Sequence, residues 1–454
     1  MICGFDYGTS NCALGVMADQ QVRLLPLEAN NAFLPSTLYA LDRDLITEFV
    51  VHHMPFEDQR QALIDGRQAV LNRAQRVRRE EDIKSSDQTL FFGRAAFAEY
   101  FEFPEEGYFV KSPKSFLGSS GLRKQHTDFF EDVVTCMMQN VKRSAEAQTG
   151  QTLTHAVIGR PVNFQGINAE QSNQQALQIL TTASHRAGFK SVEFLYEPIA
   201  AGLDFETKLE ADKTVLVVDI GGGTTDCAMV RMGPSYRDKL ERKADFLAHT
   251  GERIGGNDLD INIAAKHFMP LFGMESPLKT GLPMPTQIYW NAVMTNDVTA
   301  MTTFNSLQSE QQIEDLMRDA KQPGLLERFA RMRENKQNFH IVRNAEEGKI
   351  ALSQQQNHTI HLDYIEAGLL LELERQAVAL SIATPLQKML VLMSQAIEQA
   401  REQPDLIYIT GGSAQSPIIR AAIEERIGQV PVIDGDHFGS VAAGLTVWAE
   451  RLFR

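Results

Sequence analysis

The stretch that most constrains this chain is VLVVDIGGGTTD, residues 215–226. Its β-branched and other apolar residues predict a buried strand that ends at the carboxylate of Asp219. Glycines follow, and without Cβ atoms their backbone N–H groups can approach a ligand closely and point at it together. The residues of this turn are Gly221, Gly222, Gly223, Thr224, Thr225 and Asp226.

The turn combines groups that attract opposite charges. Backbone N–H groups and threonine hydroxyls favour an anion, whereas the acids beside them favour a cation. A polyphosphate that carries Mg²⁺ supplies both, so the pattern predicts a phosphate loop. The alternative is a tight strand turn with incidental acids.

A second stretch repeats this plan at the N-terminus. ICGFDYGTSN, residues 2–11, places an acid after an apolar strand and then glycine and hydroxyl residues. Two such turns about two hundred residues apart predict two related lobes, each presenting a phosphate loop to one cleft. The chain contains neither GxxxxGK[ST] nor GxGxxG, which excludes a Walker P-loop and a dinucleotide fingerprint. The residues of the second turn are Asp6, Gly8, Thr9, Ser10 and Asn11.

Composition bounds the class of protein. A chain of 454 residues, 43% hydrophobic and 22% charged, is long enough for two or more soluble domains. The net charge of −14 disfavours nucleic-acid binding and requires local loops, lysines and Mg²⁺ to hold a nucleotide. The four cysteines have no metal-type spacing and are interpreted as reduced and structural. A strand at residue 2 and the lack of a membrane-length apolar run predict a cytoplasmic protein that contacts no membrane.

The rest of the chain alternates between strand and helix patterns, which predicts an α/β sheet with ligands beyond the strand ends. The charged segment 55–84 is interpreted as a solvated helix face and not as a nucleic-acid site. Residues 270–300 lack clean periodicity and predict a surface insertion. Residues 364–399 predict two long amphipathic helices.

Further segments place chemistry-bearing residues at turns. YFVKSPKSFLG offers two lysines, Lys111 and Lys114, as point charges for a terminal phosphate. YEPIAAGL brings Glu197 to the start of a small-residue helix. RIGGNDLD, residues 253–260, is another Gly-Gly turn, and ITGGSAQSP is a strand–glycine–helix turn. Glu346 and Lys349 in NAEEGKIALS lie one helical turn apart, a spacing that a plain surface ion pair also explains.

Taken in order, these motifs resemble the actin-like ATPase superfamily, and within it most closely the nucleotide-binding domain of the seventy-kilodalton, DnaK-like heat-shock chaperones. The resemblance spans nearly the whole chain. It implies an α/β fold of two lobes, built from duplicated ribonuclease-H-like domains, with a nucleotide cleft between them. Lobe I is expected over 1–213, with an insertion at about 42–90, and is completed by 432–454. Lobe II is expected over 214–431, with an insertion at about 270–300.

The resemblance also implies roles for individual residues around ATP or ADP and Mg²⁺. Asp6 and Asp219 would hold the Mg²⁺ shell, mostly through waters. Lys114 would face the γ-phosphate, with Lys111 as a rival. The residues expected to take part in hydrolysis are Glu197 and Asp226, which would position the attacking water or accept its proton, and Thr224, which would donate to the phosphates. The residues expected to bind the nucleotide are Gly8, Thr9, Ser10, Asn11, Gly221, Gly222, Gly223, Thr225, Gly255, Gly256, Glu346, Lys349, Ser353, Gly411, Gly412 and Ser413.

The sequence departs from the family pattern at three places. Gln415 stands where the family has an arginine that stacks on adenine, so cation–π support is lost. Pro161 of the interlobe switch is present, but 163–176 contains no arginine to pair with it. The chain is also expected to lack the linker and the peptide-binding domain that follow in the family.

These observations predict an ATP-binding, slowly hydrolysing, chaperone-like ATPase whose lobe closure regulates an unidentified protein partner. Two alternatives stay open. A small-molecule kinase of the same superfamily would bind a sugar or polyol between the lobes, and a filament or scaffold protein would polymerise with nucleotide.

Overall fold

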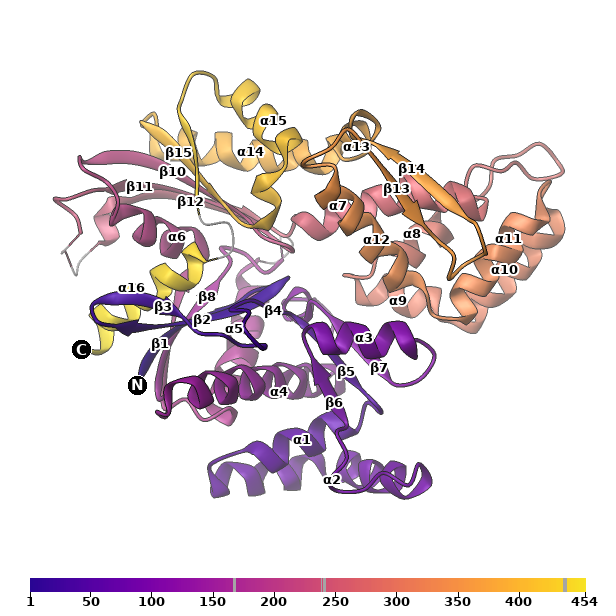
Figure 1. The fold of residues 1–454 in the computed structure, drawn as a ribbon, viewed down its shortest axis with the longest axis horizontal. Coiled ribbons are helices and arrows are strands. Elements are labelled where there is room, and N and C mark those ends of the chain that lie inside the picture. The colour runs from indigo at the N-terminus through magenta and orange to yellow at the C-terminus, as the bar shows by residue number, and fades with distance from the viewer. Residues whose placement is uncertain (166–168, 238, 240–241, 436–438) are drawn as a thin grey trace.

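The computed structural model describes residues 1–165, 169–237, 239, 242–435 and 439–454. The chain forms two lobes, each built around one mixed β-sheet (Figure 1). In lobe I the strand order is β3-β2-β1-β8-β9, with β4 paired to β2. These strands are β1 (Ile2–Tyr7), β2 (Asn11–Ala18), β3 (Gln21–Leu24), β4 (Leu34–Pro35), β8 (His155–Arg160) and β9 (Ser191–Tyr196).

The sheet of lobe II follows the same plan, with the order β12-β11-β10-β15-β16. In each lobe the central strand pairs antiparallel with the next strand and parallel with a later one. The duplicated α/β architecture predicted from the sequence is therefore confirmed. The strands are β10 (Lys213–Ile220), β11 (Thr225–Met232), β12 (Phe246–Glu252), β15 (Leu406–Thr410) and β16 (Val432–Asp434).

The helices of lobe I cover its sheet and extend away from the cleft. α4 packs against α5, and α1 and α2 pack below α4, at the foot of the molecule in Figure 1. A small sheet, in the order β6-β5-β7, lies beside α3 at the cleft. These elements are α1 (Leu45–His53), α2 (Glu57–Glu80), α3 (Arg94–Glu102), α4 (Lys124–Thr149), α5 (Ala169–Arg186), β5 (Thr37–Ala40), β6 (Leu90–Phe92) and β7 (Tyr108–Lys111).

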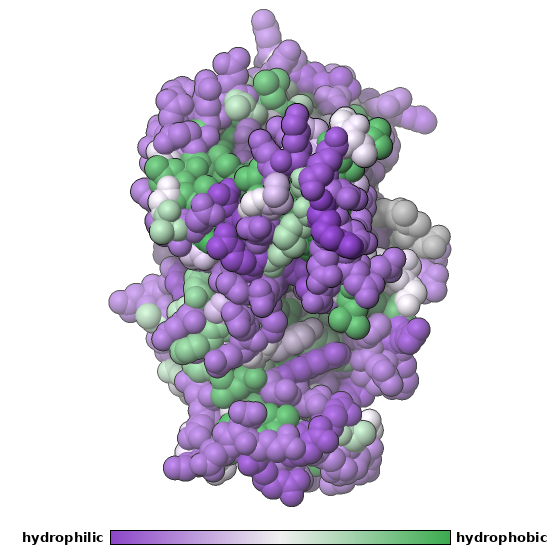
Figure 2. All heavy atoms as spheres, turned by 90° about the vertical axis from the view of Figure 1, so that its right-hand side faces the viewer, coloured by the Kyte–Doolittle hydropathy of each residue, from purple (hydrophilic) through white to green (hydrophobic). Residues whose placement is uncertain are grey.

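The outer part of lobe II is mainly helical. α14 packs on the second sheet, and α12 packs against α7, α8 and the hairpin β13–β14. Seen from the right of Figure 1, this side is mostly hydrophilic, with smaller hydrophobic areas (Figure 2). The elements are α7 (Gly256–Ile263), α8 (Gln287–Val293), α9 (Val298–Phe304), α10 (Leu307–Asp319), α11 (Pro323–Glu334), α12 (Asn338–Ala351), β13 (Asn357–His361), β14 (Leu370–Glu374), α13 (Arg375–Ser381), α14 (Ala383–Ala400) and α15 (Pro417–Ile427).

Two helices join the lobes. α6 (Glu197–Glu206) and α16 (Ser440–Phe453) pack against each other between the two sheets. A separate hydrophobic cluster surrounds them and draws Val157 from lobe I, Val217 from lobe II and Leu445 from α16. The C-terminal helix therefore returns to the first lobe and packs on β1 and β8.

Three sequence predictions need correction. Residues 270–300 are only in part a surface segment, because Tyr289 and Val293 are fully buried in the core of lobe II, whereas 279–283 are exposed. Residues 364–399 hold the strand β14 and the short helix α13 before one long helix, since 370–374 pair with 357–361. Residues 432–434 pair with β15, so the chain leaves the second sheet after, and not at, residue 432. We propose that the return to lobe I begins after β16.

Among the described residues no single helix is long and apolar enough to cross a membrane. α13 and α14 together have sufficient length and apolar composition, with a bend of 66° between them.

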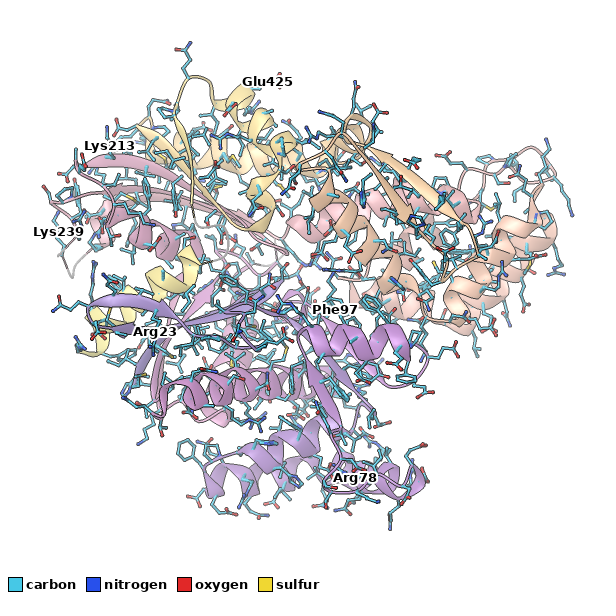
Figure 3. All side chains as sticks on the ribbon, viewed as in Figure 1. Arg23, Arg78, Phe97, Lys213, Lys239 and Glu425 are labelled. Atoms are coloured by element: carbon cyan, nitrogen blue, oxygen red, sulfur yellow. The ribbon has the colours of Figure 1, made fainter. Side chains whose placement is uncertain are left out.

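The helix α2 is attached to lobe I through a buried charge network. The Arg67 side chain, 7% exposed, donates to the Asp132 carboxylate, which is 1% exposed, over 3.1 Å. Asp132 also accepts hydrogen bonds from Thr47 and Arg186. Nearer the end of α2, Arg78 donates to Glu48 of α1 over 2.7 Å (Figure 3). The predicted insertion at 42–90 is thus held by buried charges as well as by apolar contacts.

We expect Arg67→Ala to lower the free energy of unfolding by about 3 kcal/mol, because it leaves the buried Asp132 with fewer partners. Arg73→Ala is the matched control, since Arg73 lies on the same helix, pairs with Asp44 and is half exposed. That control should change stability by less than about 1 kcal/mol. Urea unfolding of the two variants makes the comparison, and equal effects would contradict the buried network.

Candidate functional site

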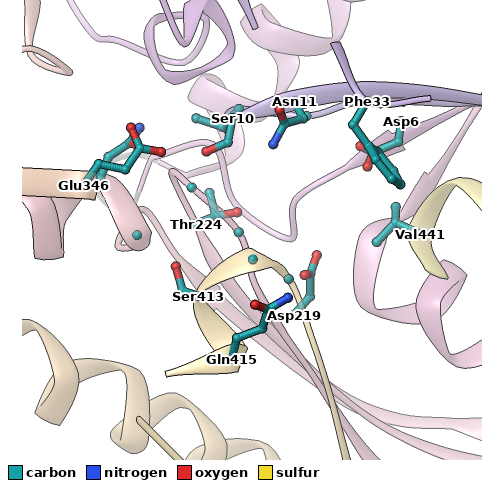
Figure 4. Close-up of a pocket in the computed structure, with 18 of the residues that line it drawn as sticks. Asp6, Ser10, Asn11, Phe33, Asp219, Thr224, Glu346, Ser413, Gln415 and Val441 are labelled. Atoms are coloured by element: carbon teal, nitrogen blue, oxygen red, sulfur yellow. The ribbon is translucent and has the colours of Figure 1, made fainter. Parts of the chain in front are cut away.

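A cavity of about 310 Å³ lies between the two sheets and is lined by both lobes. Figure 4 shows Asp6 of lobe I and Asp219 of lobe II facing this space. Sixteen of the predicted site residues line it. These are Asp6, Gly8, Thr9, Ser10, Asn11, Glu197, Asp219, Gly221, Gly222, Thr224, Gly256, Glu346, Lys349, Gly411, Gly412 and Ser413.

The two glycine–hydroxyl turns contact each other at the floor of the cavity. A Cβ atom on Gly222 would lie 1.9 Å from Ser10 Oγ, and one on Gly223 would lie 2.8 Å from Thr9 Cγ2. Side chains at these positions would therefore push the lobes apart. The loops are held by their own backbone as well, since the Gly221 N–H donates to the Thr224 carbonyl over 3.0 Å.

Carboxylates crowd the centre of the cavity. Burial, together with the charge of Glu197, raises the pKa of Asp6 to about 7, although Lys114 partly offsets this. Burial and the charges of Glu197, Asp226 and Asp6 raise the pKa of Asp219 well above its usual value. Like charges disfavour one another's ionised form, and a bound cation would relieve this repulsion. Oxygen ligands of this kind suit a small hard cation such as Mg²⁺.

The two candidate lysines occupy different places. Lys114 lies in a 3₁₀ turn, Pro113–Phe116, is 4% exposed, and donates to the Glu197 carboxylate and to the Gly159 carbonyl. Lys111 instead pairs with Glu346 of lobe II over 3.2 Å, across the cleft. Lys114 therefore reaches the inner side of the site and lines a smaller space beside the cavity, whereas Lys111 bridges the two lobes.

A second, much smaller space lies beside the two glycine–hydroxyl turns. This inner chamber, about 10 Å³, is lined by Thr9, Lys114, Ser115, Thr224 and other residues of both lobes. Its volume fits about one water molecule, which needs two or more polar partners. Ser115 Oγ is buried there without a hydrogen-bond partner among the described residues. The chamber thus has both the size and the polar groups to hold a single water.

Asp226 lies beside the cavity without lining it. It is the register partner of Asp219 on the adjacent strand, and its Oδ1 accepts a hydrogen bond from the Val162 N–H over 2.6 Å. Burial and the charge of Glu197 raise its pKa to about 7. Its Oδ2 is buried with no hydrogen-bond partner among the described residues.

The other end of the cavity has a mixed polar and apolar wall. Lys349 of α12 forms an ion pair with Asp260 over 2.7 Å and donates to the Gly256 carbonyl. Although burial opposes ionisation of Glu346, the charges of Lys111, Arg343 and Lys349 lower its pKa to about 2. Ile350, which follows Lys349 on α12, lines the cavity and is 57% exposed.

Some predicted residues lie outside the main cavity. Gly223 and Lys114 line the inner chamber instead. Thr225 is fully buried and donates to the Ile254 carbonyl, because alternation turns it away from the ligand side of β11. Gly255 packs against the backbone of Gly221 and Gly222. Ser353 lies in the turn after α12, where its hydroxyl donates to the Lys349 carbonyl.

The structure also adds residues that the sequence did not single out as site residues. Asn257 and Asp260 follow the Gly-Gly turn on α7, and their spacing from that turn was an available signal. Phe33, Ile350 and Val441 are apolar and carry no motif, so only the fold brings them to the cavity. Gln415, known as a departure from the family pattern, lines the cavity as well (Figure 4).

Aromatic contacts close the outer edge of the cleft. Tyr100 of α3 donates to the Lys336 carbonyl of lobe II and packs edge-on against Phe339. Phe97, which Figure 3 places where the lobes meet, lies 5.3 Å from the Arg343 guanidinium. These contacts join the two lobes beyond the cavity.

Comparison with known proteins shows that this chain is similar to Hsp70 and DnaK proteins. The model of the Hsp70 protein family matches residues 121–280. Two relatives, both described as "Chaperone protein DnaK" and both from strains of Halobacterium salinarum, are each 22% identical over 459 residues. The alignments cover 98% of this chain and 55% of each relative. The chain thus spans about half the length of these curated relatives.

Proposed function

We propose that this chain binds ATP and hydrolyses it slowly with Mg²⁺. The matches confirm its resemblance to the DnaK-like nucleotide-binding domain of the actin-like ATPase superfamily. One observation carries the proposal. Asp6 and Asp219 each precede a glycine–hydroxyl turn, come from separate sheets, and line the same cavity. A triphosphate gripped by both turns would hold the lobes together.

The residues present fit a magnesium ion that is bound mainly through phosphate and water. Among the described residues, no three histidine, cysteine, aspartate or glutamate side chains are arranged to hold a metal by themselves. Mg²⁺ commonly takes only one or two carboxylates and keeps several waters. Asp6 and Asp219 would supply these contacts, and the ion would neutralise charge on the phosphates.

The protein residues would do the remaining work by position and charge. Amides and hydroxyls of the two turns would hold the β- and γ-phosphates, and Lys114 would face the γ-phosphate. Hydrolysis forms a bond between a water oxygen and the γ-phosphorus and breaks the bond to the β–γ bridging oxygen, which leaves with the electron pair on ADP. The water proton would pass to a carboxylate. Glu197 is favoured over Asp226 because it lines the cavity and contacts Lys114.

The output of such a cycle would be conformational. Nucleotide that bridges the turns favours the closed lobes, and its loss lets them relax. We propose that this change regulates a protein partner in the cytoplasm, in the manner of a chaperone. The Hsp70 match favours this function over a small-molecule kinase or a filament protein.

Calorimetric titration with ATP, ADP and GTP, each with and without Mg²⁺, tests the proposal. We expect Mg²⁺-dependent binding that prefers adenine nucleotides. Asp219→Asn should reduce the affinity for Mg·ATP by about 10- to 100-fold, as the loss of a group that orients a bound metal typically does. Asp58→Asn, an exposed residue in the first turn of α2, is the control. An unchanged affinity in Asp219→Asn would contradict the assignment.

A further inference from the structure

Ser115 is a buried serine whose hydroxyl group is left over when the other polar groups of the residue are bonded. The residue is 8% exposed, and its Oγ has no hydrogen-bond partner among the described residues. Its N–H donates to the Ser112 carbonyl over 3.0 Å, and its carbonyl accepts from the Gln165 side chain over 3.4 Å. A buried hydroxyl without a partner is unfavourable unless water or a ligand satisfies it.

The turn that carries Ser115 is held in an unusual backbone conformation. Ser112, just before this 3₁₀ turn, has a φ of 55° and lies in the left-handed region, which residues other than glycine rarely adopt. Its N–H donates to the Ser36 carbonyl over 2.8 Å, and its hydroxyl accepts from the Asn257 side chain of lobe II over 3.4 Å. Contacts with both lobes therefore fix the start of the turn, and Lys114 and Ser115 both reach the inner chamber.

The Ser115 hydroxyl lies against the glycine turn of lobe II. A Cβ atom added to Gly223 would lie 3.2 Å from Ser115 Oγ and 3.0 Å from Thr9 Oγ1. Both hydroxyls therefore flank Gly223, and both residues line the inner chamber. The inner chamber has room for one water, and the two hydroxyls would be polar partners for it. Such a water supplies the bond that Ser115 lacks.

A water in the inner chamber would lie close to the groups proposed for hydrolysis. The chamber shares Thr9 and Thr224 with the main cavity, and these threonines belong to the two proposed phosphate loops. Lys114 also lines the chamber and donates to the Glu197 carboxylate, the favoured proton acceptor. The inner chamber thus adjoins both the proposed phosphate position and the ion pair that contains this acceptor.

We propose that Ser115 orients the water molecule that attacks the γ-phosphate. This inference rests on the proposed ATPase function. A lone pair of the water oxygen forms the bond to phosphorus, and the bond to the β–γ bridging oxygen breaks with its electron pair left on ADP. One water proton passes to the Glu197 carboxylate, and the other is held in a hydrogen bond that Ser115 Oγ accepts. Ser115 keeps its own proton throughout and is therefore a positioning residue.

Single-turnover hydrolysis and calorimetric binding, both measured on Ser115→Ala, test this role. Hydrolysis of bound ATP should slow by about tenfold, the effect of losing one hydrogen bond, because the water is no longer oriented. The Kd for Mg·ATP should change by less than about twofold, since no proposed contact with the nucleotide is removed. An unchanged hydrolysis rate, or an affinity that falls in parallel with the rate, would reject the role.

Ser172→Ala is the matched control for the loss of a buried hydroxyl. Ser172 lies on α5, is 6% exposed, and its Oγ also has no hydrogen-bond partner among the described residues. It differs from Ser115 in lying outside the inner chamber. Its hydrolysis rate should therefore equal that of the parent chain, and an equal loss of rate in both variants would contradict the proposal.

Crystallography tests the water without any turnover. Crystals of the parent chain, nucleotide-free and with a non-hydrolysable ATP analogue, should show one ordered water within about 3 Å of Ser115 Oγ, and Ser115→Ala should lack it. If the parent chain hydrolyses no ATP, the proposed function fails, but these crystals still decide whether Ser115 holds a water. An inner chamber without water in the parent crystals would overturn the proposal. Transfer of labelled γ-phosphate to Ser115 would also overturn it, because the serine would then be the acceptor.

Discussion

Glu197→Gln is expected to reduce ATP hydrolysis by about 100-fold or more, the contribution typical of a positioned general base. Glu197 begins α6, lines the cavity between the lobes and accepts a hydrogen bond from the buried Lys114. The amide keeps the shape and still offers an oxygen to Lys114, so the fold should survive. It cannot take a proton from water, so single-turnover hydrolysis should fall while ATP binding persists.

Glu193→Gln is the matched control, because Glu193 lies four residues earlier on β9 and is exposed. Its hydrolysis rate should equal that of the parent chain. If Glu197→Gln hydrolyses ATP at the parental rate, the proton acceptor is another group. Asp226, the other carboxylate candidate, would then become the first alternative to test by Asp226→Asn.

The parts of the fold that the sequence predicted well are those where local pattern and backbone chemistry agree. β10 and its glycine turn form as predicted, because an apolar β-branched run favours a buried strand and three successive glycines favour a turn. The repeated acid–glycine–hydroxyl pattern correctly indicated two related sheets. Placing Asp6 and Asp219 in one cavity followed from that duplication alone.

The failures share a different cause. β14 is a two-sided, partly exposed strand with charged residues, and its pattern does not distinguish it from an amphipathic helix. Tyr289 and Val293 are buried by neighbouring helices that no local pattern reveals. Arg253 stands in the RIGGNDLD turn, where the sequence singled out the glycines, and only the three-dimensional arrangement brings its side chain to the inner chamber.

Gly444→Val is expected to lower the free energy of unfolding by about 3 kcal/mol or more, because an added side chain cannot fit where α16 crosses α6. A Cβ atom at Gly444 would lie 1.6 Å from the Ala200 carbonyl oxygen. That neighbour is helix backbone, so only a shift of one whole helix could relieve the clash. Denaturant unfolding measures the loss.

The same substitution should also weaken nucleotide binding in the fraction that remains folded. α6 carries Glu197 at its first residue and α16 carries Val441, and both residues line the cavity. A shift at the crossing therefore moves both walls. Gly324→Ala on α11 is the control, since a Cβ there meets no atom within 4 Å. It should change stability by less than about 1 kcal/mol. If Gly444→Val were as stable as the parent chain, α6 and α16 could not cross as closely as described. The proposed coupling of the two lobes through these helices would then be wrong.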